Sequence, residues 1–120
     1  MTAAGSVIGR LRTTDDFKIV ISKGMRIRSG HLSLTYLANG TGEMRLGVNI
    51  PGHTAKSAVR RNRLRRVVRE GLRMMAGRLA LGIDFVVTVS ADPGRGEGEI
   101  IRSELNELID KGRLWRNAEE

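Results

Sequence analysis

The segment Ser57–Arg73, SAVRRNRLRRVVREGLR, carries the densest run of positive charge in this chain of 120 residues. Its arginines are Arg60, Arg61, Arg63, Arg65, Arg66, Arg69 and Arg73. A single acid, Glu70, lies among them. Like charges one helical turn apart repel each other by about a few tenths of a kcal/mol. A segment that served only the fold would alternate its charges, so this one predicts a polyanionic partner.

Apolar residues recur along the same segment with the period of an α-helix. On a helical wheel one side holds Leu64, Val67, Val68, Gly71, Leu72 and Met75. The opposite side holds Asn62, Arg63, Arg65, Arg66, Arg69 and Arg73, while Arg60 and Arg61 can turn outward from the first turn. Thr54 or Ser57 can cap this helix, which we expect to run to about Ala76. The pattern predicts one face docked on a sheet and one face covered by guanidinium groups.

The flanking segments indicate an α/β protein. TTDDFKIVISKG (13–24) predicts a helix with Thr13 or Thr14 as its cap, and EIIRSELNELIDKG (99–112) predicts an amphipathic helix. RIRSGHLSLTYLANG (26–40) and EMRLGVNI (43–50) predict two strands joined by a hairpin turn at Asn39-Gly40. IDFVVTVSA (83–91) is apolar almost throughout, as expected of a strand buried on both faces. The residue patterns alone therefore predict the order α-β-β-α-β-α, with helices on a small sheet.

Composition narrows the class of protein further. The net charge is +8 and the isoelectric point about 11.2, while 40% of the residues are hydrophobic. Residues 1–96 carry a net charge of +11 and residues 97–120 a net charge of −3. Nucleic acid or an anionic membrane surface is the natural partner for such a chain. A DNA-reading helix is disfavoured because no second helix precedes the arginine segment at helix-turn-helix spacing.

Several other classes are excluded or disfavoured. The chain has no Cys, which excludes disulfides and thiolate metal sites. It shows neither a secretory signal pattern nor an apolar run of the roughly 20 residues that a membrane span requires. We therefore expect a cytoplasmic protein without a membrane partner. His31 and His53 are the only histidines and have no metal-binding spacing, so we predict neither a catalytic residue nor a metal site in the protein itself.

The sequence AVRRNRLRRVVRE, centred on Arg61-Asn62-Arg63, resembles the signature of the bacterial ribonuclease P protein subunit. Three further stretches are similar to this family: RLRTTDDF near the N-terminus, EMRLGVNI before the signature and GIDFVVTVSADPG after it. The resemblance spans about residues 10–112. It implies one domain over residues 10–114, and we expect a flexible arm over 1–9 and a loose tail over 115–120.

The family resemblance implies a two-layer α/β sandwich of order α-β-β-β-α-β-α, a fold also found in a ribosomal protein domain. One more strand than the residue patterns predict should therefore exist, near residues 26–30. The crossover around the arginine-rich helix should be left-handed, against the general rule for such connections.

The resemblance also implies the activity. In this family the protein is a subunit of an endonuclease that removes the 5′ leader from precursor tRNA, and the RNA subunit with bound Mg²⁺ is the catalyst. The expected partners are ribonuclease P RNA and precursor tRNA, with no DNA, and the protein alone is expected to be a monomer. The residues expected to bind the RNA subunit are Arg60, Arg61, Asn62, Arg63, Arg65, Arg66, Arg69 and Arg73.

A cleft between the sheet, the first helix and the arginine-rich helix should hold the single-stranded leader. By resemblance its residues are Arg10, Arg12, Phe17, Ile21, Ser33, Thr35 and Tyr36. The family usually shows a Ser and paired basic residues in the loop before the signature, whereas this chain has PGHTAKS (51–57), with Pro51, Gly52 and His53, and is one residue longer. His53 and Lys56 are expected to replace part of the missing charge. An alternative function is that of a non-enzymatic RNA-binding or ribosomal-type protein on a similar scaffold.

Overall fold

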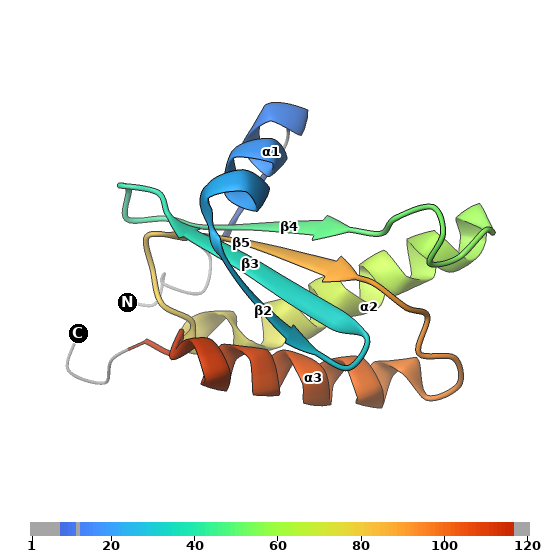
Figure 1. The fold of residues 1–120 in the computed structure, drawn as a ribbon. Coiled ribbons are helices and arrows are strands. Elements are labelled where there is room, and N and C mark those ends of the chain that lie inside the picture. The colour runs from blue at the N-terminus through green and yellow to red at the C-terminus, as the bar shows by residue number, and fades with distance from the viewer. Residues whose placement is uncertain (1–7, 12, 117–120) are drawn as a thin grey trace.

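The computed structural model describes residues 8–11 and 13–116. They form a five-stranded mixed sheet with helices on both faces (Figure 1). The elements in chain order are β1 (Ile8–Arg10), α1 (Thr14–Lys23), β2 (Met25–Ser29), β3 (Leu32–Ala38), β4 (Met44–Asn49), α2 (Ala58–Met75), a short 3₁₀ turn (Ala76–Arg78), β5 (Ile83–Val89) and α3 (Glu97–Gly112). The mixed α/β class is confirmed, and so is the additional strand near residues 26–30, which is β2.

The strands follow the order β1-β4-β5-β3-β2 across the sheet. β5 is central, parallel to β4 and antiparallel to β3. The predicted hairpin between β3 and β4 is therefore wrong, because β5 lies between these two strands. Every residue of β5 after Ile83 is buried, and a strand that apolar on both faces belongs in the middle of a sheet. Asn39-Gly40 is still a turn, and Gly40 has a φ of 73°, but it leads the chain past β5.

Both predicted termini of the domain contain more structure than expected. Ile8 and Gly9, expected in the flexible arm, form β1 together with Arg10, and this strand pairs in parallel with Met44–Leu46 of β4. At the other end, Trp115 forms a β-bridge with Leu79, and its ring lies 5.0 Å from the Arg78 guanidinium carbon. Local sequence patterns missed both because a three-residue strand and a single bridge depend on partners far away in the chain.

α2 and α3 cover one face of the sheet (Figure 1). Ser57 caps α2 by accepting a hydrogen bond from the backbone N–H of Arg60 at 3.2 Å. The buried side of α2 consists of Leu64, Val68, Gly71, Leu72 and Met75, as the helical wheel predicts, and Val67 is partly buried beside them. α3 buries Ile101, Leu105, Leu108 and Ile109 in the same core.

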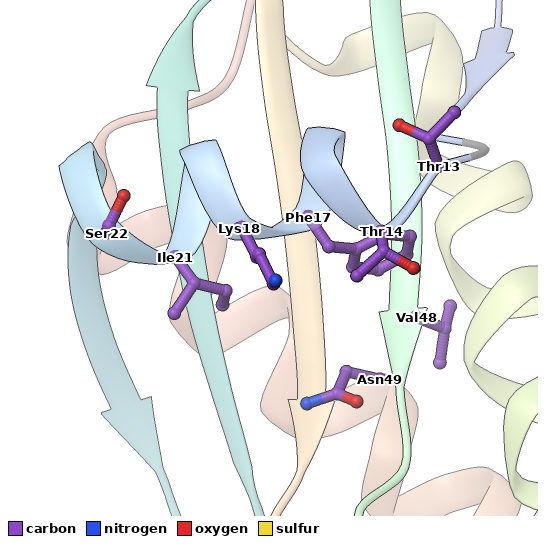
Figure 2. A pocket seen from close by; sticks show the side chains of 8 residues that line it. All are labelled: Thr13, Thr14, Phe17, Lys18, Ile21, Ser22, Val48 and Asn49. Atoms are coloured by element: carbon purple, nitrogen blue, oxygen red, sulfur yellow. The ribbon is translucent and has the colours of Figure 1, made fainter.

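α1 packs on the opposite face of the sheet, so the sandwich has a partial third layer. Thr13 caps α1 by accepting from the backbone N–H of Asp16 at 3.0 Å. Val20 of α1 forms a second, smaller core with Leu11 and Val86, and Phe17 packs against this core. α1 crosses the strands on that face of the sheet (Figure 2).

Charged and polar side chains form a hydrogen-bonded network on the α1 face, at the start of β5. The buried Asp84 accepts hydrogen bonds from the Arg45 guanidinium at 2.8 and 2.7 Å and from the Asn39 amide at 2.8 Å. Burial alone would raise the pKa of Asp84, but the hydrogen bonds from Arg45 and Asn39 outweigh it and lower the pKa below its usual range.

The lowered pKa of Asp84 predicts a pH-dependent contribution to stability. Ionised Asp84 stabilises the fold above its unfolded-state pKa of about 4, and this stabilisation is lost as the pH falls through the folded-state pKa. Asp84→Asn should lower the free energy of unfolding at pH 7 by about 1–3 kcal/mol, because one amide N–H then faces the Arg45 donors. Urea unfolding between pH 7 and pH 3 should show a flatter acid limb for the variant. An unchanged acid limb would contradict this role.

Candidate nucleic-acid interface

The arginines of α2 lie outside the core, as predicted. Arg63, Arg66 and Arg73 are exposed, and Arg60, Arg61, Arg65 and Arg69 are partly exposed. The guanidinium groups are thus available at the surface while Leu64 and Leu72 on the opposite side are fully buried. Because α2 lies beside α3 over the sheet, its exposed arc divides into a side that faces α3 and a side that faces the outer edge of the sheet.

On the side of α2 near α3, two arginines form ion pairs with acidic residues. Arg60 binds Asp92 through two hydrogen bonds of 2.9 and 2.7 Å and also reaches the carbonyl of Gly94. Arg63 binds Glu97, the first residue of α3, at 2.5 Å. The hydrogen bonds from Arg60 and the Gly94 amide lower the pKa of Asp92 to about 2. These pairs fix the loop before α3 against the start of α2 and neutralise part of its charge.

The other side of α2 carries Arg61, Arg65 and Arg69 at intervals of one turn. Arg61 donates to the carbonyls of Ala55 and Lys56 at 2.8 and 2.9 Å, which fixes the preceding loop. Arg65 donates to the side chain of Asn62 at 3.1 Å. Since Arg60 and Arg63 face α3, this second stripe faces away from α3, toward β4 and the outer edge of the sheet. Among the described residues, neither Arg61 nor Arg65 pairs with an acid.

β4 has an open edge next to this stripe. β1 pairs only with Met44–Leu46, and the backbone N–H of Leu11 adds one bond to the Leu46 carbonyl at 3.0 Å. Within the described part of the chain, no strand pairs with the outer edge of Gly47–Asn49. A pocket of about 720 Å³ opens there (Figure 2). Its lining residues are Thr13, Thr14, Phe17, Lys18, Ile21, Ser22, Val48 and Asn49.

The wall and floor of the pocket depend on one close approach between α1 and the sheet. A Cβ atom on Gly47 would lie 2.7 Å from Cζ of Phe17 and 3.1 Å from a methyl carbon of Leu11. Glycine therefore lets the Phe17 ring lie directly on β4. Figure 2 shows this ring between α1 and the strands, with Lys18 and Ile21 pointing from the helix toward the side on which Asn49 lies. An aromatic wall with a nearby cation suits unpaired bases and their phosphates.

Some of the predicted cleft residues line the pocket, and others do not. Phe17 and Ile21 line the pocket, and Ile21 is 46% exposed. Ser33 and Thr35 lie on the same sheet face as α1 but are buried. Tyr36 is a correction: it packs against the core beneath α2 and α3, on the opposite face, because neighbouring strand residues point to opposite sides.

Two predicted cleft arginines lie at the limit of the described structure. The backbone of Arg10 belongs to β1, its side chain is outside the described part, and Arg12 is outside the described residues. Sequence reasoning missed Lys18, Val48 and Asn49 of the pocket. The helical spacing Thr14, Phe17, Lys18, Ile21 was a usable signal for Lys18. No local pattern indicates that the end of β4 is an open edge.

The loop before α2 is tied to the fold. The Thr54 hydroxyl donates to the carbonyl of Val89 at 2.7 Å, and its backbone N–H donates to the Pro51 carbonyl. His53 and Lys56 are exposed beside it.

Among the described residues no three His, Cys, Asp or Glu side chains gather closely enough to hold a metal ion. Within that part of the chain, no helix has the length and apolarity to span a membrane.

Comparison with known proteins gives a consistent result. The ribonuclease P family model matches residues 8–113. The ribonuclease P protein component of Aliivibrio fischeri is 34% identical over 106 residues, which cover 88% of this chain and 85% of that protein. The corresponding protein of Histophilus somni is 32% identical over 107 residues, with 89% and 84% covered.

Solved structures agree with the sequence comparisons. The ribonuclease P protein from Thermotoga maritima superposes with a TM-score of 0.75 at 29% identity, over 85% of this chain and 96% of that one. The Staphylococcus aureus protein, at 19% identity, shares the fold with a TM-score of 0.80 over 89% and 97% of the two chains. An α2 surface of arginines, a pocket at an open strand edge and a family match over nearly the whole described domain lead to one conclusion: this chain belongs to the ribonuclease P protein family.

Proposed function

We propose that this chain is the RNA-binding subunit of ribonuclease P and assists the RNA subunit in removing the 5′ leader from precursor tRNA. The observation that carries this proposal is the position of the pocket beside the Arg61–Arg65–Arg69 stripe of α2. A cationic surface and a site for unpaired bases thus meet at one edge of the sheet. The cytoplasm is the compartment that fits this role, and the protein alone is proposed to be a monomer.

The exposed face of α2 is assigned to ribonuclease P RNA. Arg guanidinium groups bind phosphates through two parallel hydrogen bonds, and each phosphate neutralised releases counterions. Arg66 and Arg73 are exposed and have no ion-pair partner among the described residues. Arg60 and Arg63 must exchange Asp92 and Glu97 for phosphate, or share them, so their contribution to RNA binding is smaller than their charge suggests.

The pocket at the β4 edge is assigned to the leader. Stacking on Phe17 accepts any base, because every base has a π-face. Lys18 can bind the adjacent phosphate, and Asn49 offers hydrogen bonds at the opposite rim (Figure 2). A protein that holds the leader there assists the reaction by binding substrate and by screening the repulsion between two RNA molecules.

The catalytic groups are assigned to the RNA subunit with Mg²⁺. Mg²⁺ is held by oxygen ligands such as phosphates and keeps several waters, and the described side chains provide no cluster that fits it. His31 already serves the fold: its Nδ1 and backbone N–H bind the Glu104 carboxylate at 2.8 and 2.7 Å. The protein is therefore proposed to position the RNA and the substrate rather than to move protons in the reaction.

The decisive test is reconstitution. At low Mg²⁺, where ribonuclease P RNA alone cleaves precursor tRNA slowly, near-stoichiometric amounts of this protein should restore leader removal. Gel analysis of the 5′ leader product measures the effect. A ribosomal-type RNA-binding protein would bind RNA without restoring cleavage, and that outcome would support the alternative function.

The assignment of α2 predicts a clean effect of Arg66→Gln. Because Arg66 is exposed and unpaired among the described residues, the variant should keep its melting temperature. Its affinity for ribonuclease P RNA should fall, and the slope of log K against log salt should become shallower by about 0.7–0.9. Arg102→Gln on α3 removes the same charge from another surface and serves as the control. Equal losses of RNA affinity in the two variants would mean that the effect arises from net charge alone, and would contradict the assignment of α2.

The assignment of the pocket predicts a leader-dependent effect of Phe17→Ala. Loss of one stacked base should weaken binding of leader-bearing substrate by about 5–150-fold and leave mature tRNA binding unchanged. Gly47→Ala should act in the same direction, because the new methyl group displaces the Phe17 ring. Tyr36→Phe, on the opposite sheet face, is the control. A loss in Tyr36→Phe as large as that in Phe17→Ala would refute this placement.

A further inference from the structure

The residues that follow α3 fold back onto the segment that follows α2 (Figure 1). Leu79 and Trp115 form an antiparallel β-bridge. The backbone N–H of Arg116 donates to the Arg78 carbonyl at 2.6 Å, and the Nε of Arg116 donates to the Leu79 carbonyl at 3.2 Å. Arg78 belongs to the 3₁₀ turn just past the end of α2, and these contacts fix its backbone in the fold.

Trp115 supplies a rigid aromatic surface beneath Arg78. Its ring packs against the main core, and its indole N–H donates to the Asp110 carboxylate at 2.6 Å. A partly buried Trp with a satisfied N–H keeps one orientation. The guanidinium of Arg78 lies over this ring, with its central carbon 5.0 Å from the ring centroid, which is within the range of a cation–π interaction. The Arg78 side chain is therefore held in place as well as its backbone.

Arg78 keeps its hydrogen-bond donors and its charge. A cation–π contact occupies one face of the guanidinium and leaves the N–H donors around its edge free. The side chain is exposed, and no acid pairs with it among the residues that the structure describes. Arg60 and Arg63, in contrast, donate to Asp92 and Glu97. An arginine that is already ordered and not neutralised loses little entropy when it binds a phosphate.

Positive charge accumulates at the end of the molecule where Trp115 lies. Arg73, on the last turn of α2, and Arg113, at the C-terminal cap of α3, are both exposed. The Nη2 of Arg116 is buried and has no hydrogen-bond partner among the described residues, so no described group satisfies this part of its cation. Asp110 is the acid that contacts the ring, through the indole N–H. The field at this end of the molecule therefore attracts an anion.

We propose that Arg78, held on the Trp115 ring, binds a backbone phosphate of ribonuclease P RNA beyond the end of α2, with Trp115 and Arg116 as positioning residues. This inference rests on the proposed assignment of the exposed α2 face to that RNA. Arg73 lies two turns after Arg66 on the same side of α2, so an RNA strand bound along the helix reaches the turn that contains Arg78. The leader pocket lies on the α1 face of the sheet, which favours the RNA subunit over the leader as the occupant.

The first test measures the affinity of the full-length protein for ribonuclease P RNA alone, without precursor tRNA, by filter binding over a range of salt concentrations. Arg78→Gln should bind about tenfold more weakly, the loss expected when a hydrogen bond to a charged group is removed. Its slope of log K against log salt should become shallower by about 0.7–0.9. Arg26→Gln removes the same charge from the exposed strand β2 and should bind as the wild type does.

A double-mutant cycle tests the positioning role of Trp115. Trp115→Leu keeps every arginine, so the salt slope should stay that of the wild type. The RNA affinity should fall by about 2–10-fold, because the freed Arg78 side chain must then be ordered on binding. In the Arg78→Gln background the same change should cost no further affinity. An equal loss in both backgrounds would mean that Trp115 serves only the fold, and would overturn its positioning role.

Arg78→Lys provides a second test, which does not disturb the core. It keeps the charge and removes the planar guanidinium, so the salt slope should again stay that of the wild type. The RNA affinity should fall by about 2–10-fold, because an ammonium binds phosphate as a point charge and not through two parallel hydrogen bonds. Wild-type affinity in Arg78→Lys would overturn the role of the stacked guanidinium.

Other outcomes separate this inference from the proposed function. Equal losses in Arg78→Gln and Arg26→Gln, or a loss confined to leader-bearing precursor tRNA, would overturn the proposed contact. Unchanged RNA affinity in Arg78→Gln would also overturn it, while a loss in Arg66→Gln would leave the α2 assignment intact. If the wild type does not bind ribonuclease P RNA, the proposed function fails and this inference fails with it. Thermal melting curves verify that each variant is folded at the assay temperature.

Discussion

The complete burial of β5 is the constraint on which the rest of the structure depends. Phe85, Val86, Val87 and Val89 are inaccessible to solvent, and their side chains alternate between two faces of the sheet. Both faces therefore need a cover, which α2 and α3 provide on one side and α1 on the other. β4 and β3 must flank β5 to satisfy its backbone hydrogen bonds. This arrangement leaves β4 near the outer edge, where the pocket and the arginine stripe of α2 meet.

The arginines of α2 are held in two different ways, and the difference has a functional consequence. Arg60 and Arg63 are tied to Asp92 and Glu97, which bind α2 to the start of α3. Such partly exposed pairs contribute modestly to stability, but they fix where the helix begins. Arg61 donates to the backbone carbonyls of Ala55 and Lys56, Arg65 donates to the Asn62 side chain, and Arg66 and Arg73 are exposed. The helix thus combines a first turn fixed by ion pairs with an exposed surface rich in arginine.

Charge is distributed unevenly over the α1 face of the sheet. Asp84 and Arg45 neutralise each other at one end, whereas Lys18 and Arg28 stand without acidic partners among the described residues at the other. The close contact of Phe17 with Gly47 divides the two regions. The same face that buries Val20 and Val86 for stability also positions the groups that would hold a nucleic acid.

Local patterns in the sequence determined the helices, their caps and the apolar side of α2, because these depend on residues within one or two turns of each other. They also determined that α2 presents arginines at the surface and that Ile83–Val89 is a buried strand. The family resemblance supplied the extra strand β2. Only the tertiary structure decided that β5 separates β3 from β4, that Tyr36 lies on the far face, and that Val48 and Asn49 line one pocket with Phe17. Strand order and register bring together residues distant in the chain, and no short-range spacing encodes that proximity.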